Sequence, residues 1–413
     1  MEHILGDLDG KTDVLRFIVG FLSFRDWQNS VLRVPPPPFS ANDTLPTASF
    51  YADSFLMHMA PEMLRCVTSV KVPRTGMHLL SLLRALPALN SLRFWDYPYW
   101  TPETEEQQED EPAINVAAVL QLLPSLQDLN VADADITLSE LLDAASTGVN
   151  RDLEPPGWHL RALDLAETDI VDLSPLVVLN KLQSLSIRRT NVLALNVLEA
   201  LPELHVLDVS ETRVTDFASL KGLTMLETLD MSKNWVSTDL EMLQSLTALR
   251  SLKLNNLGAS DALELVLNCP ELEILHVQNT RLTDVEFARG LPNLTYLDVR
   301  WTHVGDRRSL AALESLEQLL LDTRERGASV AEQQDAPLLA PPVTYEWLDS
   351  LQKLRKLHRG KRQLARRHRD HHTSFDFLAR LTGLEELSLV GRVDFKDASL
   401  LSGQHLIVDN DSL

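Results

Sequence analysis

The stretch LHVLDVSETRVTDFASLKGLTM, residues 204–225, contains in 22 residues the pattern that decides the fold. Its first six residues have the form L-x-x-L-x-L. The same form begins at eight positions separated by 22 or 23 residues: Leu160, Leu182, Leu204, Leu226, Leu249, Leu272, Leu294 and Leu316. Self-similarity at a fixed period of this length indicates a solenoid, in which one structural unit is stacked many times.

Weaker copies of the pattern extend the array in both directions. They begin at Val67, Leu89, Leu126 and Leu384, and a degenerate final unit is predicted to begin at Leu406. In each copy the three apolar residues would point into the core, while the residue between the last two stands on the open face of a strand. Burial of each aliphatic side chain contributes about 1.5–3 kcal/mol, and no single unit can hide its own apolar face.

Two polar positions recur after the strand. A hydroxyl or amide recurs nine residues into most units and can supply a hydrogen bond to the backbone: Thr168, Thr190, Thr212, Asn234, Thr280 and Thr302. An aspartate twelve or thirteen residues after the first leucine of many units is predicted to cap a short convex helix: Asp172, Asp216, Asp239, Asp261, Asp284 and Asp306. These aspartates are therefore interpreted as structural rather than catalytic.

With this pattern, residues 67–413 resemble the leucine-rich-repeat family, in the 22-residue class found in internalins and in a nuclear regulator of protein phosphatase 1. The resemblance implies an α/β solenoid: a horseshoe with a parallel concave β-sheet, about twelve repeats and an N-terminal α-helical cap. It also implies a binding protein rather than an enzyme.

Three insertions interrupt the period, at about 95–112, 141–158 and 322–375, and insertions in repeat arrays often line the binding face. The last one carries a basic patch over 353–369: Lys353, Arg355, Lys356, Arg359, Lys361, Arg362, Arg366, Arg367 and Arg369. The patch is interpreted as a solvated helix or loop, a nuclear import signal, or a nucleic-acid contact of a ribonucleoprotein-associated protein. No aromatic residues alternate with its basic residues, which disfavours a base-stacking platform.

The apolar stretch 13–38, which ends in four prolines, precedes the repeats, and residues 39–66 are predicted to be a linker and N-terminal cap. One interpretation of 1–38 is a helical cap over the first repeat, because open arrays require one. The other is an F-box-like segment, because Val14, Leu15, Ile18, Phe21, Leu22, Arg25 and Asp26 resemble the F-box pattern. That resemblance implies a ubiquitin-ligase substrate receptor in which Leu15, Ile18, Phe21 and Leu22 contact a Skp1-type adaptor. Gly10-Lys11, where F-boxes usually have Leu-Pro, and Pro35–Pro38 depart from the pattern.

The net charge of -21 over 413 residues disfavours bulk binding to nucleic acid or anionic membrane and suits a basic protein partner. Cys66 and Cys269 lie far apart, and disulfide-bonded end caps are therefore not expected, which favours a reducing compartment. No apolar run reaches the roughly 20 residues that span a membrane. The expectation is a soluble intracellular protein, cytoplasmic or also nuclear.

The sequence contains none of the common catalytic motifs, so neither enzymatic activity nor a cofactor or metal is predicted. His368, His371, His372 and Asp370 lie in an arginine-rich segment, which opposes cation binding. Cys269 is predicted to be a core residue.

The open strand positions and the residues just beyond them are the candidate contacts for a partner. They are Arg93, Trp95, Asp164, Arg188, Asp208, Asp230, Lys253, His276, Asp298, Arg300 and Trp301. Exposed aromatic and arginine side chains are frequent anchors of protein interfaces, and a partner with a basic strip and an apolar knob would match this set. The predicted function is a non-catalytic interaction scaffold, a subunit of a larger complex.

Overall fold

The computed structural model describes residues 68–73, 80–84, 86–95, 113–146, 159–234, 240–257, 266, 268–302, 304, 307–322, 346–360, 381, 383–389 and 405–407. The chain divides into two compact units. The first contains Met1–Leu193 and Ala200–Leu204, and the second contains Ala194–Glu199 and His205–Leu413.

The first unit is built on a parallel sheet whose strands follow one another in chain order. These strands are β1 (Ser69–Pro73), β2 (Ser91–Trp95), β4 (Asp128–Asn130), β6 (Ala162–Asp164) and β7 (Ser184–Ser186). Short helices connect them: α6 (Leu80–Leu83), α7 (Val116–Leu122), α8 (Glu140–Ser146) and the 3-10 helix η2 (Ser174–Val178). A small second sheet pairs β3 (Ile114–Asn115) with β5 (Ile136–Thr137).

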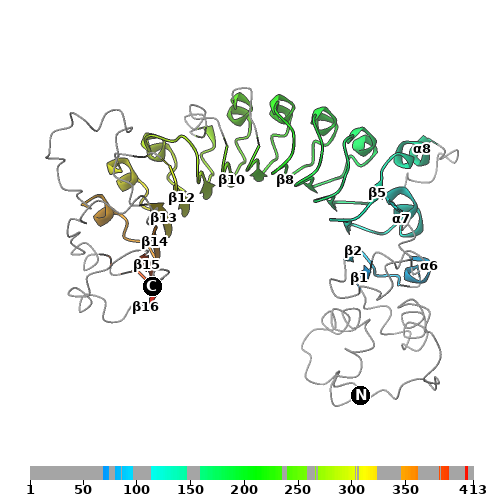
Figure 1. Cartoon of the computed structure of the whole chain (residues 1–413), viewed down its shortest axis with the longest axis horizontal. Helices are drawn as coiled ribbons and strands as arrows, with labels where there is room; N and C mark the ends of the chain where they lie inside the picture. The colour runs from blue at the N-terminus through cyan, green and yellow to red at the C-terminus, as the bar shows by residue number, and fades with distance from the viewer. Residues whose placement is uncertain are drawn as a thin grey trace, which may run out of the picture. The chain divides into compact units, whose positions relative to one another are not determined.

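The second unit repeats one strand and one 3-10 helix with little variation. Its parallel strands are β8 (Val206–Asp208), β9 (Thr228–Asp230), β10 (Ser251–Lys253), β11 (Ile274–His276), β12 (Tyr296–Asp298), β13 (Gln318–Asp322), β14 (Lys356–Gly360), β15 (Glu386–Leu389) and β16 (His405–Ile407). Its 3-10 helices are η4 (Ala218–Gly222), η5 (Glu241–Ser245), η7 (Glu286–Gly290), η8 (Arg308–Ala312) and η9 (Glu346–Ser350). A further 3-10 helix, η3 (Asn196–Ala200), has residues in both units. Within the second unit the strands β8–β13 lie along one edge and the helices along the other (Figure 1).

The leucines of the repeat form the core, as the pattern predicts. The central leucine of β4 and of each strand from β6 to β12, such as Leu207, Leu229 and Leu252, is buried. Its two neighbours in the strand are half-buried or exposed, except in β12, where Asp298 is also buried. Cys269 is also completely buried, which confirms its predicted place, and burial raises the pKa of its thiol to about 11. The predicted parallel-sheet solenoid is therefore confirmed.

Both recurring polar positions have the predicted structural roles. The hydroxyls of Thr168, Thr190 and Thr280 donate to the carbonyl three residues earlier, at 2.7, 2.7 and 2.8 Å. The carboxylates of Asp172, Asp216 and Asp284 accept a hydrogen bond from the first amide of the following helix, at 2.8, 2.9 and 3.1 Å. The helices that they cap are five-residue 3-10 turns. Asp239, Asp261 and Asp306 lie outside the described residues.

The turn after β4, and after each strand from β6 to β12, contains a left-handed residue. Among the described residues, eight non-glycine residues have φ between 53° and 60°, one in each of eight repeats: Asp133, Glu167, Arg189, Glu211, Lys233, Asn256, Asn279 and Trp301. The conformation costs a residue that has a Cβ atom about 1–2 kcal/mol relative to the right-handed form. It is held because the amide of the left-handed residue bonds the next repeat, as in Glu167 N to Arg188 O at 2.7 Å.

The repeat boundaries differ from the prediction in the C-terminal part. The described residues contain fourteen strands of the repeat rather than about twelve. One additional repeat, formed by η9 and β14, lies inside the predicted insertion 322–375, and β16 belongs to the degenerate final unit. This repeat was missed because Arg359 occupies its third apolar position. In β16, Leu406 pairs with Leu387, so the last repeat is shifted by three residues from the predicted start at Leu406. The helix α8 occupies the beginning of the predicted insertion 141–158.

The N-terminal cap, the F-box-like segment and the linker, residues 1–66, lie outside the described residues. Among the helices that are described, none has the length and apolar character required to cross a bilayer.

Candidate binding surface

The candidate surface is the open side of strands β8–β13 in the second unit, here called the strand face. Each strand contributes two outward positions. The first row is Val206, Thr228, Ser251, Ile274, Tyr296 and Gln318, and the second row is Asp208, Asp230, Lys253, His276, Asp298 and Leu320. The register pairs each residue of a row directly with the next, as in Asp208 with Asp230 and Lys253 with His276. Neighbouring strands lie about 4.8 Å apart, so the rows are continuous ladders.

The aspartates of the second row also stabilise the turn after their strands. Asp208 Oδ1 accepts hydrogen bonds from the amide and the hydroxyl of Ser210, at 2.9 and 2.6 Å. Asp230 Oδ1 accepts one from the Ser232 amide at 2.9 Å. The same contact joins Asp164 to the Ala166 amide at 3.1 Å in the first unit. The frequent Leu-Asp dipeptide of this chain therefore has a structural cause whether or not a ligand binds.

Asp208 nevertheless retains binding capacity at the strand face. Both hydrogen bonds from Ser210 reach Oδ1, and among the described residues no further hydrogen bond reaches its Oδ2. Burial raises the pKa of the Asp208 carboxyl, against the lowering effect of the Ser210 hydrogen bonds, and the charge of Asp230 raises it further. The ionised carboxylate is therefore incompletely solvated in the unbound chain.

Lys253 partly neutralises the second acid of the row. Its Nζ lies 3.4 Å from Asp230 Oδ2, and the side chain of Lys253 is 41% exposed. The three adjoining positions Asp208, Asp230 and Lys253 therefore carry one net negative charge, located at the β8 end.

Asp298 differs from the expectation of an open acidic position. Its side chain is 1% exposed and forms a two-point ion pair with Arg300, in which Nε and the terminal nitrogen Nη2 donate at 2.9 and 2.7 Å. The pair is formed within one repeat, over two residues of sequence. Asp298 and Arg300 were both predicted contacts, but in the unbound chain they satisfy each other.

An aromatic contact lies beside this ion pair. The rings of His276 and Tyr296 have centroids 4.5 Å apart and are tilted by 34°. Burial lowers the pKa of His276, although the carboxylate of Asp298 acts in the opposite direction. Burial also raises the pKa of Tyr296, so that both rings are neutral near pH 7. Tyr296 is not among the predicted contacts, although its place two residues after Leu294 puts it in the first row.

The remaining predicted contacts belong to other places in the fold. Arg93 is exposed on β2, whereas the side chain of Trp95 is not among the described ones. Arg188 and Arg189 both pair with Glu167, each at 3.1 Å, beyond the end of β7. Trp301 is 42% exposed in its left-handed turn after β12. Only Asp208, Asp230, Lys253, His276 and Asp298 are brought together on five adjoining strands.

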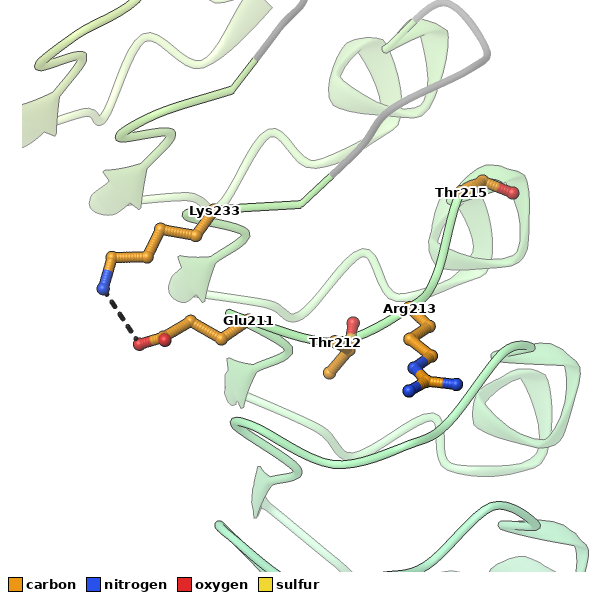
Figure 2. A pocket seen from close by; sticks show the side chains of 5 residues that line it. All are labelled: Glu211, Thr212, Arg213, Thr215 and Lys233. Atoms are coloured by element: carbon orange, nitrogen blue, oxygen red, sulfur yellow. Dashed lines mark ion pairs between the residues drawn. The ribbon is translucent and has the colours of Figure 1, made fainter.

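A hollow of about 360 Å³ lies along the loop between β8 and η4. Figure 2 shows the side chains that line it. It is lined by Glu211, Thr212, Arg213, Thr215 and Lys233. Lys233 Nζ lies 3.2 Å from Glu211 Oε1 on the strand side of the hollow, and Thr215 lies on the helix side. Its acid, Glu211, and one of its two bases, Lys233, are paired with each other.

The structure places only part of the basic patch. Lys356 Nζ lies 2.9 Å from Glu386 at the start of β15, and Arg355 Nε lies 3.9 Å from Glu385, just before β15. Lys353 is exposed in the turn before β14. Arg359 belongs to β14, but its side chain is not described. Lys361, Arg362, Arg366, Arg367 and Arg369 lie outside the described residues, as do His368, Asp370, His371 and His372. Within the described part of the chain, no group of three metal-ligating side chains is present.

Comparison with known proteins agrees with this architecture. A family model described as a leucine-rich repeat matches residues 290–307, around β12. An internalin (inlF) from Listeria monocytogenes is similar in structure with a TM-score of 0.59 and 21% sequence identity, over 87% of this chain and 93% of the internalin. A leucine-rich-repeat protein of Leptospira interrogans aligns with a TM-score of 0.52 and 16% identity, over 84% and 91% of the two chains. No curated protein sequence matches the chain.

These similarities establish the architecture rather than a shared partner. Together with the repeat spacing and the parallel strand order, they show that the chain has the leucine-rich-repeat fold.

Proposed function

We propose that this chain is a non-catalytic scaffold that binds a protein partner on the strand face of the second unit, as part of a larger complex. The observation that carries the proposal is the continuous double row of side chains on β8–β13. Repeat solenoids use such extended strand surfaces for recognition, because the stacked backbone holds each side chain at a constant spacing.

The electrostatics of the strand face support a partner that brings a positive charge. Asp208 has an oxygen available at Oδ2 and a raised pKa caused by burial. A guanidinium or ammonium group would restore the solvation that the carboxylate has lost. The net charge of -21 would also accelerate the approach of a basic protein.

The test is affinity purification with mass spectrometry, using the full chain and variants that obstruct the strand face. Thr228→Arg and Ser251→Arg place long side chains at half-buried first-row positions. Thr224→Arg and Thr247→Arg are the matched controls, because both threonines are exposed in the turns that precede the same strands. Partners that are lost with the first pair and retained with the second support the proposal, and retention with both pairs would contradict it.

Two alternatives rest mainly on residues outside the described part of the chain. An F-box-like receptor requires residues 1–38, and recovery of Skp1 that persists after their deletion would eliminate it. A ribonucleoprotein role requires the basic patch, in which Lys356 and Arg355 already pair with acids. RNA crosslinking that survives charge reversal of Arg362, Arg366, Arg367 and Arg369 would eliminate the second alternative.

A further inference from the structure

We infer that the strand face is divided into an acidic end on β8–β9 and an apolar end on β11–β13, and that it recognises a protein segment carrying one basic and one apolar side chain about 14 Å apart. The inference rests on the proposed function and specifies the chemistry of the partner. The second row carries three aspartates and one lysine, but the structure leaves their charges unevenly available to a partner.

The acidic end is defined by the negative charge that is not neutralised by basic groups of the chain itself. Asp208 keeps Oδ2 available, and Asp230 shares its charge with Lys253 at 3.4 Å. Val206, beside Asp208 in the same strand, is 39% exposed, and its surface suits the aliphatic stem of an arginine or lysine. Lys253 on β10 repels a basic side chain placed further along the row. A basic group of the partner is therefore directed to β8 and β9.

The apolar end is defined by the removal of charge. Asp298 is buried and held by both donors of Arg300, so it presents no free acid to a partner. Asp298 lies on β12, between His276 on β11 and Leu320 on β13. The ring of His276 stacks against that of Tyr296, which is also on β12. Ile274 precedes His276 on β11. The half-buried side chains Ile274, Tyr296 and Leu320 thus form an apolar surface on three adjoining strands.

The spacing between the two ends follows from the strand register. Asp208 on β8 and Ile274 on β11, the nearest side chain of the apolar end, are separated by three strand intervals, or about 14 Å. An extended segment covers that distance in about four residues, with both side chains on one side. A helix with both groups on one face covers it in about seven or eleven residues. The number of residues between the basic and the apolar side chain of a bound segment would therefore show whether the segment is extended or helical.

The test is selection of a phage-displayed random 16-residue peptide library on the full chain, followed by anisotropy titration of a selected synthetic peptide. The expected peptides contain Arg or Lys and a large apolar residue at a constant separation of about four, seven or eleven. Binding should weaken about tenfold in Asp208→Asn combined with Asp230→Asn, since both asparagines retain the Oδ1 acceptor of the turn. This difference should shrink at high salt because the charges are partly exposed.

The matched control is Glu314→Gln, which removes one exposed acid in the turn before β13 and should leave affinity unchanged. A variant with both Tyr296→Ser and Leu320→Ser should select peptides that still contain Arg or Lys but no longer share a large apolar residue. Two outcomes would overturn this inference while the scaffold proposal stands, provided that Thr228→Arg blocks binding of the selected peptides. One is that the peptides contain no basic residue. The other is that their affinity is unchanged in the variant with Asp208→Asn and Asp230→Asn. Peptides insensitive to both Thr228→Arg and Ser251→Arg would contradict both proposals.

Discussion

Asn234 links its own repeat to the preceding one through Thr212. Its Oδ1 accepts a hydrogen bond from the Thr212 amide at 2.9 Å, and its Nδ2 donates to Val209 O and Met231 O at 2.8 and 3.1 Å. Both side chains are buried. The corresponding threonines bond within their own repeats, so Asn234 supplies a connection between repeats that they do not.

Asn234→Ala should lower the free energy of unfolding by about 2–4 kcal/mol, since each of three hydrogen bonds contributes roughly 0.5–1.5 kcal/mol. Urea unfolding followed by circular dichroism measures the change. Thr280→Val is the control, because it removes one hydroxyl bond of 2.8 Å within a repeat and should lower stability by only about 1 kcal/mol. Equal losses in the two variants would contradict the linking role of Asn234.

Asp208→Asn should raise the unfolding midpoint at pH 7. The folded-state pKa of Asp208 is raised above its ordinary value of 3.8, mainly by burial, so the folded chain binds protons more strongly than the unfolded chain. Stability is therefore lost as pH rises from 3.8 through the folded-state pKa, and the neutral asparagine avoids this loss. Thermal unfolding at pH 7 and near pH 4 tests the expectation.

Asp172→Asn is the control of opposite sign. Hydrogen bonds from the Ser174 side chain and amide lower the pKa of Asp172, so its ionised form stabilises the fold above 3.8. That variant should be less stable at pH 7, and its deficit should vanish as pH falls.

A destabilised Asp208→Asn would show that the Ser210 hydrogen bonds, rather than burial, dominate at the strand face.

His276 should make the folded chain less stable as pH falls below 6.5. Burial lowers the folded-state pKa of this histidine from 6.5, so the unfolded chain binds more protons in that range. Asp230 and Asp298 favour the protonated ring, whereas Lys253 and Arg300 oppose it. Urea midpoints between about pH 5 and pH 8 should show a shallower slope for His276→Gln. Identical slopes would show that other groups account for the pH dependence.

Arg300→Met should lower the free energy of unfolding by about 1.5–3 kcal/mol, because it leaves the buried carboxylate of Asp298 without its charged donors. The control is Arg289→Met, whose pair with Glu286 at 2.8 Å is 66% and 58% exposed and should contribute under about 0.5 kcal/mol. Chemical denaturation of both variants gives the comparison. A loss for Arg300→Met no larger than that of the control would indicate that Asp298 regains solvent when its partner is removed.

Much of the fold follows from spacing alone. The interval of 22 or 23 residues places Leu207 and Leu229 in equivalent buried positions, and the threonine and aspartate positions follow as local turn and helix contacts. Such features depend on residues a few positions apart or one repeat apart. The repeat at β14 escaped the pattern because Arg359 replaces its last apolar residue.

The sequence by itself determined which residues stand in rows on the strand face, because register is a consequence of the period. Only the tertiary structure decided which of those residues keep an unsatisfied charge. Asp208, Asp230 and Asp298 occupy the same position in the motif, yet Asp298 is buried under Arg300, Asp230 meets Lys253 on the next strand, and Asp208 retains an available oxygen. Burial and pairing depend on side chains brought together across strands and turns, and a periodic pattern carries no information about how those side chains orient.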